Sequence, residues 1–246
     1  MDDGSTDRVK DVLNPFIEKE LITMMPSSPK TIPFRQTGIY KKSYAEIVSS
    51  NDTKWLAIID LDEFIYAPKV VDIRTVLREH EDLALVGLNW VWFGSSSLVE
   101  QPQGVVQSFL RRADMDTSKY PEFIEHYKIM APSRHHYNDW QKYIINTDHD
   151  VDNIDIHSVV IEGIADNLSY NRYPEDPPLL LNHYSVQSRD FFLKNKAARG
   201  DVNNWAMEDS KNLQRFRVYD INDVLDSRLA EQNSIYVTLS EASSVV

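Results

Sequence analysis

Short apolar runs alternate along the chain with segments that have helical spacing. Two of these runs, at 55–60 and 83–94, are nearly continuous, which is the pattern of strands buried on both faces of a sheet. Shorter or more polar runs predict further strands at 21–26, 105–113, 157–167 and 177–185.

Apolar residues with helical spacing predict helices at 7–21, 43–51, 72–83, 188–200 and 221–232. The helix at 188–200 has the clearest boundaries, because Ser188 is a candidate N-cap and Gly200 a candidate residue just after the C-terminus. Asp72 is placed to begin another helix, and Pro15 is expected to interrupt the first one.

Strands that alternate with helices predict an α/β fold with a mostly parallel sheet, which binds its ligands just beyond the carboxyl ends of the strands. The segment 114–155 is polar, aromatic and irregular, and is predicted to form loops over such a site. We expect residues 1–217 to form one domain and residues 218–246 to form a tail with a short helix.

Composition and charge narrow the function classes. The 246 residues carry a net charge of −12, which disfavours nucleic acid and anionic membranes as partners. The absence of cysteine excludes disulfides, thiolate zinc sites and cysteine nucleophiles. The sequence has no apolar run of about 18 residues and no signal-peptide pattern, so we expect no membrane span and a cytoplasmic location.

Three carboxylates, Asp60, Asp62 and Glu63, follow directly after the apolar run at 55–60. On an extended backbone Asp60 and Asp62 project from the same side. Hard oxygen ligands in this arrangement suit Mg²⁺ or Mn²⁺, and a cation would relieve the repulsion between the carboxylates. The alternative is a polar strand end that caps the next helix.

Two further motifs contain candidate ligands. In "DDGSTD", Asp2 and Asp3 are candidates to accept hydrogen bonds from a base or a ribose, or the segment is an ordinary turn with a helix cap. In "LNHYS", His183 follows an apolar strand and is either a further metal ligand or a structural histidine.

The order of several motifs indicates a family. The chain contains "DDGSTD", "KWLAIIDLDEF", "LNWVWFGSSS", "KYII" at Lys142, "IHS" at Ile156 and "LNHYSVQSRDFFLKNKAARG". This series resembles the family 92 and related family 2-like glycosyltransferases of the GT-A fold. The resemblance runs from Asp2 to about Asp201.

The resemblance implies a single nucleotide-sugar-binding α/β domain of the GT-A type. Asp60 and Asp62 match the Asp-x-Asp motif, in which the second aspartate binds Mn²⁺ or Mg²⁺ and the first leans toward the sugar nucleotide. His183 matches a metal or diphosphate ligand, so the implied metal ligands are Asp60, Asp62 and His183. Asp2 and Asp3 match carboxylates that face the base and the ribose.

The same resemblance assigns a basic helix to the site. Lys194 and Arg199 match the basic residues of its "K…RG" pattern and would face phosphate or acceptor, the alternative being a solvated helix face. Trp90, Trp92 and Trp140 are candidates to stack on a sugar ring, although burial in the core is the default for the first two.

The implied reaction is an inverting transfer of a sugar from a UDP- or GDP-sugar to a glycan or another hydroxyl acceptor. The cation would neutralise the leaving diphosphate, and a carboxylate would accept the acceptor proton. Asp139 is the first candidate for this base and Glu122 the second, and either is otherwise a solvated loop carboxylate.

One departure from the family pattern keeps other functions open. GT-A domains have a strand, a helix and a second strand before "DDGSTD", whereas only Met1 precedes it here, so we expect an N-terminally incomplete domain. The alternatives are a non-catalytic nucleotide- or carbohydrate-binding remnant of the fold and a metal-dependent phosphohydrolase.

Overall fold

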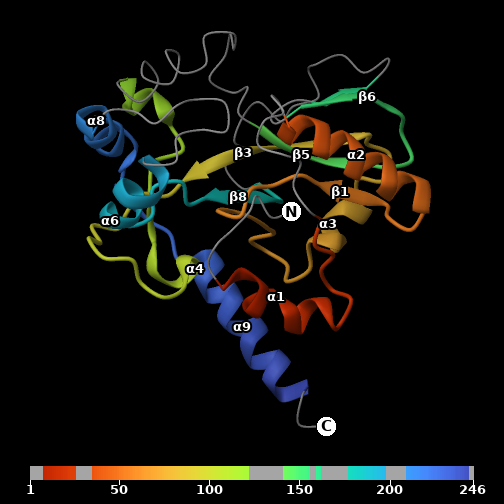
Figure 1. The fold of residues 1–246 in the computed structure, drawn as a ribbon, viewed down its shortest axis with the longest axis horizontal. Coiled ribbons are helices and arrows are strands. Elements are labelled where there is room, and N and C mark those ends of the chain that lie inside the picture. Colours follow the sequence, from red (N-terminus) through yellow and green to blue (C-terminus); the bar gives the residue numbers. More distant parts are fainter. Residues whose placement is uncertain are drawn as a thin grey trace.

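The fold is built on a five-stranded sheet with helices around it (Figure 1). The computed structural model describes residues 8–25, 35–121, 141–155, 159–161, 177–197 and 209–243. The strand order in the sheet is β1-β5-β3-β8-β2. These strands are β1 (Trp55–Ala57), β2 (Glu63–Tyr66), β3 (Leu85–Trp92), β5 (Gln141–Asn146) and β8 (Leu180–His183).

The sheet is mixed. β3 pairs with β8 in parallel, but β3 with β5, β1 with β5, and β2 with β8 are all antiparallel. The α/β class is therefore confirmed, whereas the prediction of a mostly parallel sheet is wrong. The main cause is β5, which lies in the segment predicted to form loops and inserts between β1 and β3.

The run at 55–60 does not form the predicted strand with two buried faces. Only Trp55–Ala57 is extended, and within the described sheet this strand is an edge that pairs with β5 alone. Ile59 is 42% exposed. An edge position leaves apolar residues partly in solvent, so a continuous apolar run here does not indicate a central strand.

The helices follow their local signals in most places. The described helices are α1 (Val9–Ile17), α2 (Arg35–Ser50), α3 (Ile73–Arg78), α4 (Val105–Ser108), α6 (Arg189–Phe191), α8 (Asp209–Tyr219) and α9 (Arg228–Ser243), with a 3₁₀ turn at Thr117–Lys119. α6 continues as a π-helical stretch, η3 (Phe192–Lys196). Both predicted N-caps are confirmed, because Asp72 accepts a hydrogen bond from the Arg74 amide and Ser188 accepts one from the Phe191 amide. Gly200, the predicted residue after the C-terminus of its helix, lies outside the described residues.

Four local predictions are wrong. Residues 21–25 contain no strand, and residue 26 lies outside the described residues. The predicted strand at 105–113 is α4 followed by the two-residue strand β4 (Arg111–Arg112). Pro15 lies inside α1 rather than interrupting it. The predicted helix at 221–232 contains the strand β9 (Val224–Leu225), and α9 begins only after it.

Two small sheets complete the described structure. β4 pairs with β9, and β6 (Val151–Ile154) pairs with β7 (Val159–Ile161), both antiparallel. β7 confirms the strand expected near 157–167 over the residues that are described there. No helix among the described residues combines the length and the apolar character needed to cross a membrane. The division into residues 1–217 and 218–246 stays a prediction.

The two faces of the sheet cover separate apolar cores. Along β3 and the residue that follows it, Trp90 and Trp92 belong to one cluster, which also contains Leu181, whereas Val91 and Phe93 belong to another. Successive side chains in a strand point to opposite faces, so this alternation follows from the sequence of β3 itself. The side chains of Glu63 and His183 contact Trp90 and therefore lie on the first of these faces.

Candidate functional site

A tight turn joins the end of the β1 segment to β2 and presents the carboxylates. The Glu63 amide donates to the Asp60 carbonyl at 3.0 Å, and the Asp60 amide donates to Glu63 Oε2 at 2.8 Å. Leu61 points away from the protein and is 99% exposed. Glu63 then opens β2 directly opposite His183, which ends β8. The turn is thus held against the carboxyl ends of the parallel strands β3 and β8.

Asp60 and Glu63 share one buried lysine from β5. Lys142 Nζ lies 3.0 Å from Asp60 Oδ2 and 3.6 Å from Glu63 Oε2, and its side chain is 1% exposed. Trp90 Nε1 donates to the other oxygen of Glu63 at 2.7 Å. Burial alone would lower the pKa of Lys142, but the carboxylates of Asp60 and Glu63 raise it by more than burial lowers it. The net pKa is therefore raised and the amine stays charged.

The carboxyl group of Glu63 does not keep its ordinary acidity. Burial raises its pKa to about 7, and the neighbouring charge of Asp60 acts in the same direction, against the opposing effect of Lys142. A single ammonium group shared by two carboxylates is insufficient to keep both fully ionised in this environment. Glu63 therefore titrates near neutral pH.

Asp62 has a lysine of its own. Its Oδ2 forms an ion pair with Lys196 Nζ at the end of η3, and its Oδ1 lies 3.9 Å from His183 Nε2. The Asp62 side chain is 13% exposed and that of Lys196 is 32% exposed. Burial alone would raise the pKa of Asp62, but His183 and Lys196 together lower it by more than burial raises it. The net pKa is therefore lowered and the carboxyl group is ionised.

His183 packs against two tryptophans that also contact each other. Its ring centroid is 4.7 Å from that of Trp90 and 4.9 Å from that of Trp92. Its Nδ1 is buried and has no hydrogen-bond partner among the described residues. Burial lowers the pKa of His183 to about 4, although Asp62 acts to raise it, so the imidazole is neutral at pH 7. At that pH Lys196, rather than His183, carries the positive charge beside Asp62.

Helix α2 adds a phenol near the shared lysine. Burial raises the pKa of Tyr40, and the carboxylate of Asp60 raises it further. Gln36, one helical turn earlier, donates to the Tyr40 oxygen at 2.6 Å. The phenol therefore stays protonated.

Only some of the predicted site residues can be placed. The structure gathers Asp60, Asp62 and His183 around the start of β2 and the end of β8. Lys194 does not join them, because its side chain is 75% exposed and pairs with Asp190 at 3.4 Å. Six predicted residues lie outside the described residues: Asp2, Asp3, Glu122, Asp139, Trp140 and Arg199.

The tryptophans of β3 have a packing role. Trp90 and Trp92 are only 4% and 8% exposed and belong to the first core. Their rings hold the imidazole of His183 in place, which leaves little of their own surface for a sugar ring. The default interpretation of these two residues is therefore confirmed.

The implied Mn²⁺ or Mg²⁺ does not fit the described side chains as they are arranged. Among the residues that the structure describes, no group of three histidine or acidic side chains converges as metal ligands would. Asp60 is bound by Lys142 and Asp62 by Lys196, so both candidate carboxylates already have a cationic partner. Of the three implied ligands, Asp62 and His183 face one another at 3.9 Å.

Sequence reasoning missed both lysines of the site. Lys142 was hidden in a segment predicted to form loops, although the apolar residues after it in "KYIIN" are a strand signal. Lys196 lies two positions after the predicted Lys194, and a step of two residues in a helix places a side chain on a different face. Recognising β5 as a strand would have indicated Lys142 as a buried charge.

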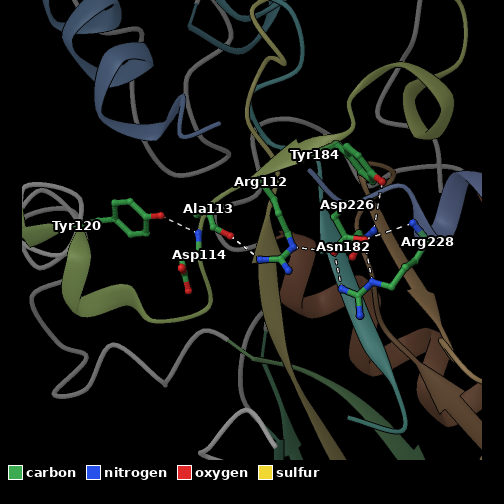
Figure 2. A network of polar contacts seen from close by, with 8 residues as sticks. All are labelled: Arg112, Ala113, Asp114, Tyr120, Asn182, Tyr184, Asp226 and Arg228. Carbon is green, nitrogen blue, oxygen red and sulfur yellow. Dashed lines mark hydrogen bonds and ion pairs between the residues drawn. The ribbon is translucent and has the colours of Figure 1, made fainter. Parts of the chain in front are cut away.

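A second buried carboxylate, Asp226, lies outside this cluster (Figure 2). Arg112 Nε donates to its Oδ2 at 2.7 Å, and Arg228 Nε donates to its Oδ1 at 2.8 Å. The Asp226 amide also donates to the Leu110 carbonyl at 2.7 Å. Burial raises the pKa of Asp226, but the two arginines lower it to about 2. The network joins the start of α9 to β4 and has the form of a structural clamp.

Comparison with known proteins does not add a family assignment. No model of a known protein family matches the chain, and no curated protein matches it either. The functional argument therefore depends on the residues of the cluster.

Proposed function

We propose that the chain is a GT-A-type glycosyltransferase domain that binds a UDP- or GDP-sugar at the turn from Asp60 to Glu63. The observation that supports this most directly is the cluster of Asp62, His183 and Lys196 at the carboxyl ends of β3 and β8. Ligands of α/β proteins bind beyond the carboxyl ends of parallel strands, and clusters of groups with perturbed pKa values mark functional sites.

The chemistry of the cluster is compatible with a sugar diphosphate. The Lys196 ammonium has three N–H donors and is partly exposed, so it can donate to a phosphate oxygen while it stays beside Asp62. His183 is neutral at pH 7 and adds no charge. The proposal includes Mn²⁺ or Mg²⁺ only as the cofactor that the family resemblance implies, and no step depends on it.

In the proposed reaction the acceptor hydroxyl attacks the anomeric carbon of the donor sugar. The bond between this carbon and the diphosphate breaks, and the diphosphate leaves with its electron pair. A carboxylate accepts the hydroxyl proton. Inversion at the anomeric centre follows because the hydroxyl attacks the face opposite the leaving diphosphate in a single displacement. Asp139 and Glu122 remain the candidates for this base.

A second candidate function is a non-catalytic binding remnant of the same fold. The observation that favours it is the lysine partner of each aspartate, because an internally neutralised site has less need of an external cation. Both candidates predict nucleotide binding, and only the first predicts a glycoside product.

The test is calorimetric titration with UDP and GDP, with and without Mn²⁺, on the wild-type chain and on Asp62→Ala. Lys194→Met is the matched surface control. Mn²⁺-dependent binding that is lost in Asp62→Ala and retained in Lys194→Met would support the site, and turnover of a UDP- or GDP-sugar with an acceptor would support the enzyme. Failure to bind either nucleotide would contradict both candidates.

A further inference from the structure

The two aspartates of the turn have lysine partners that differ greatly in solvent exposure. Lys142 is enclosed between Asp60 and Glu63 with 1% of its side chain exposed, so it cannot leave without unfolding its surroundings. Lys196 is 32% exposed and lies at the last residue of η3. The amine beside Asp60 is therefore enclosed by the protein, whereas the amine beside Asp62 is accessible to solvent.

We propose that Lys196 is an internal cation that occupies the position of a divalent ion at Asp62, and that such an ion binds only by displacing it. This inference rests on the proposed function for the choice of site, but not on nucleotide binding or glycosyl transfer. It accounts for the disagreement between the family resemblance, which implies a metal, and the arrangement of the described side chains.

The geometry around Asp62 supports competition at one place. Lys196 contacts Oδ2, and the Nε2 of His183 faces Oδ1 at 3.9 Å. This separation is too long for a hydrogen bond, and it is within the roughly 4.2 Å that two ligands lying about 2.0–2.2 Å from one ion can span at most. An ion bound there would lie beside the Lys196 ammonium, and two cations at such a distance repel strongly.

Release of Lys196 requires no change in the backbone. The next residue, Ala197, is 3% exposed and belongs to the first core, so the end of η3 is held in place. The long side chain of Lys196 reaches from this fixed point to Asp62 and can rotate into solvent. π-Helical stretches such as η3 are frequent at functional sites.

Lys194 provides a matched control. It lies two residues earlier in the same stretch, carries the same charge, and pairs with Asp190 at the surface. Lys194→Met and Lys196→Met both remove one positive charge from the same helical segment. A difference between them reports on contact with Asp62 rather than on net charge.

The experiment is Mn²⁺ binding, measured by the loss of the free-ion electron paramagnetic resonance signal and by calorimetry, without nucleotide. We expect Lys196→Met to bind Mn²⁺ at least tenfold more tightly than the wild type, and Lys194→Met to bind as the wild type does. Asp62→Asn added to Lys196→Met should remove the gain. Lys196→Gln, which keeps a polar side chain, should show the same gain and guards against misfolding of the first variant.

Two results would overturn the inference: equal Mn²⁺ affinity in the wild type and in both Lys196 variants, or an equal gain in Lys194→Met. The melting temperature gives an independent check, because Mn²⁺ should raise that of Lys196→Met more than that of the wild type. A gain in Mn²⁺ affinity in a chain that binds neither UDP nor GDP would contradict the proposed function and leave the Lys196 inference standing.

Discussion

Two buried carboxylates of this protein have opposite acidities. The side chains of Asp226 and Glu63 are 2% and 0% exposed, yet the pKa of Asp226 is lowered to about 2 and that of Glu63 is raised to about 7. Asp226 receives two arginines, which surround it with charged donors (Figure 2). Glu63 shares the single amine of Lys142 with Asp60.

The difference lies in the number of charged donors for each carboxylate. Two guanidinium groups outweigh the desolvation of one carboxylate, so the ionised form of Asp226 is stabilised. One ammonium group between two carboxylates cannot compensate the desolvation of both. The Asp226 network is therefore a structural clamp, and the Lys142 cluster is a place where charge is held at a cost to stability, as is common at functional sites.

The largest effect is expected when the shared lysine is removed. Lys142→Met leaves Asp60 and Glu63 without their cation, and loss of one partner of a buried ion pair costs roughly 3–5 kcal/mol of unfolding free energy. Urea unfolding at pH 7 measures this loss. Lys142→Met combined with Glu63→Gln should recover part of it. A loss below about 1 kcal/mol would show that Lys142 is not a buried counter-ion.

The pH dependence of stability separates Glu63 from its surroundings. Its pKa is raised from 4.5 to about 7, so its contribution is fully present below pH 4.5 and is lost as the pH rises through 7. Glu63→Gln should remove this loss, which amounts to about 3 kcal/mol relative to the wild type across that window. Urea midpoints between pH 4.5 and 7.5 test this.

His183 opposes Glu63 over nearly the same pH range. Its pKa is lowered from 6.5 to about 4, so its contribution is present above pH 6.5 and is lost as the pH falls through 4. The pH dependences that Glu63 and His183 give to the unfolding free energy should largely cancel in the wild type. The unfolding free energy should rise with pH in Glu63→Gln, where His183 remains, and fall with pH in His183→Gln, where Glu63 remains. If the urea midpoints of the wild type and both variants changed with pH in parallel, the raised pKa of Glu63 and the lowered pKa of His183 would be contradicted.

A smaller effect of the same kind is expected at Asp226. Its pKa is lowered from 3.8 to about 2, so its contribution is present above pH 3.8 and is lost as the pH falls through 2. This contribution amounts to about 2 kcal/mol. Asp226→Asn should lower stability at neutral pH and flatten the acid limb of the urea midpoints between pH 5 and 2.5. An unchanged acid limb would mean that the arginines do not hold Asp226 ionised.

The smallest effect on stability is expected at Lys196. Its ion pair with Asp62 is partly exposed, and such pairs contribute about 1 kcal/mol or less. Lys196→Met should therefore unfold within about 1 kcal/mol of the wild type, in contrast to Lys142→Met. A loss as large as that of Lys142→Met would show that both lysines are structural and that Asp62 is not reversibly neutralised.

Much of the local structure was predictable from the sequence. α3 follows its Asp72 cap, α6 follows its Ser188 cap, and β3 and β8 coincide with apolar runs. Such signals are local, because a cap acts on its own helix terminus and an apolar run reports its own burial. The position of His183 at the end of β8 followed from the same signals, whereas Asp60 and Asp62 lie in the turn before β2.

The pairing of the strands was not predictable in this way. β5 reads as a polar and aromatic segment, and its place beside β3 depends on contacts with strands more than 50 residues away in sequence. The edge position of β1, which pairs with β5 alone among the described strands, also depends on pairing between residues far apart in sequence. The need for glycine at position 94 is a further feature that depends on distant residues. A Cβ there would lie 2.4 Å from the carbonyl oxygen of Ile221, a neighbour that no local pattern reveals.

The sequence by itself determined where the strands β3 and β8 and several of the helices form, and that acidic side chains cluster after the run at 55–60. Only the tertiary structure decided that Lys142 is buried between Asp60 and Glu63, and that Lys196 rather than Lys194 reaches Asp62. The physical reason is that an ion pair depends on distance in space. Chain folding brings together side chains 82 and 134 residues apart, and this separation carries no local signal.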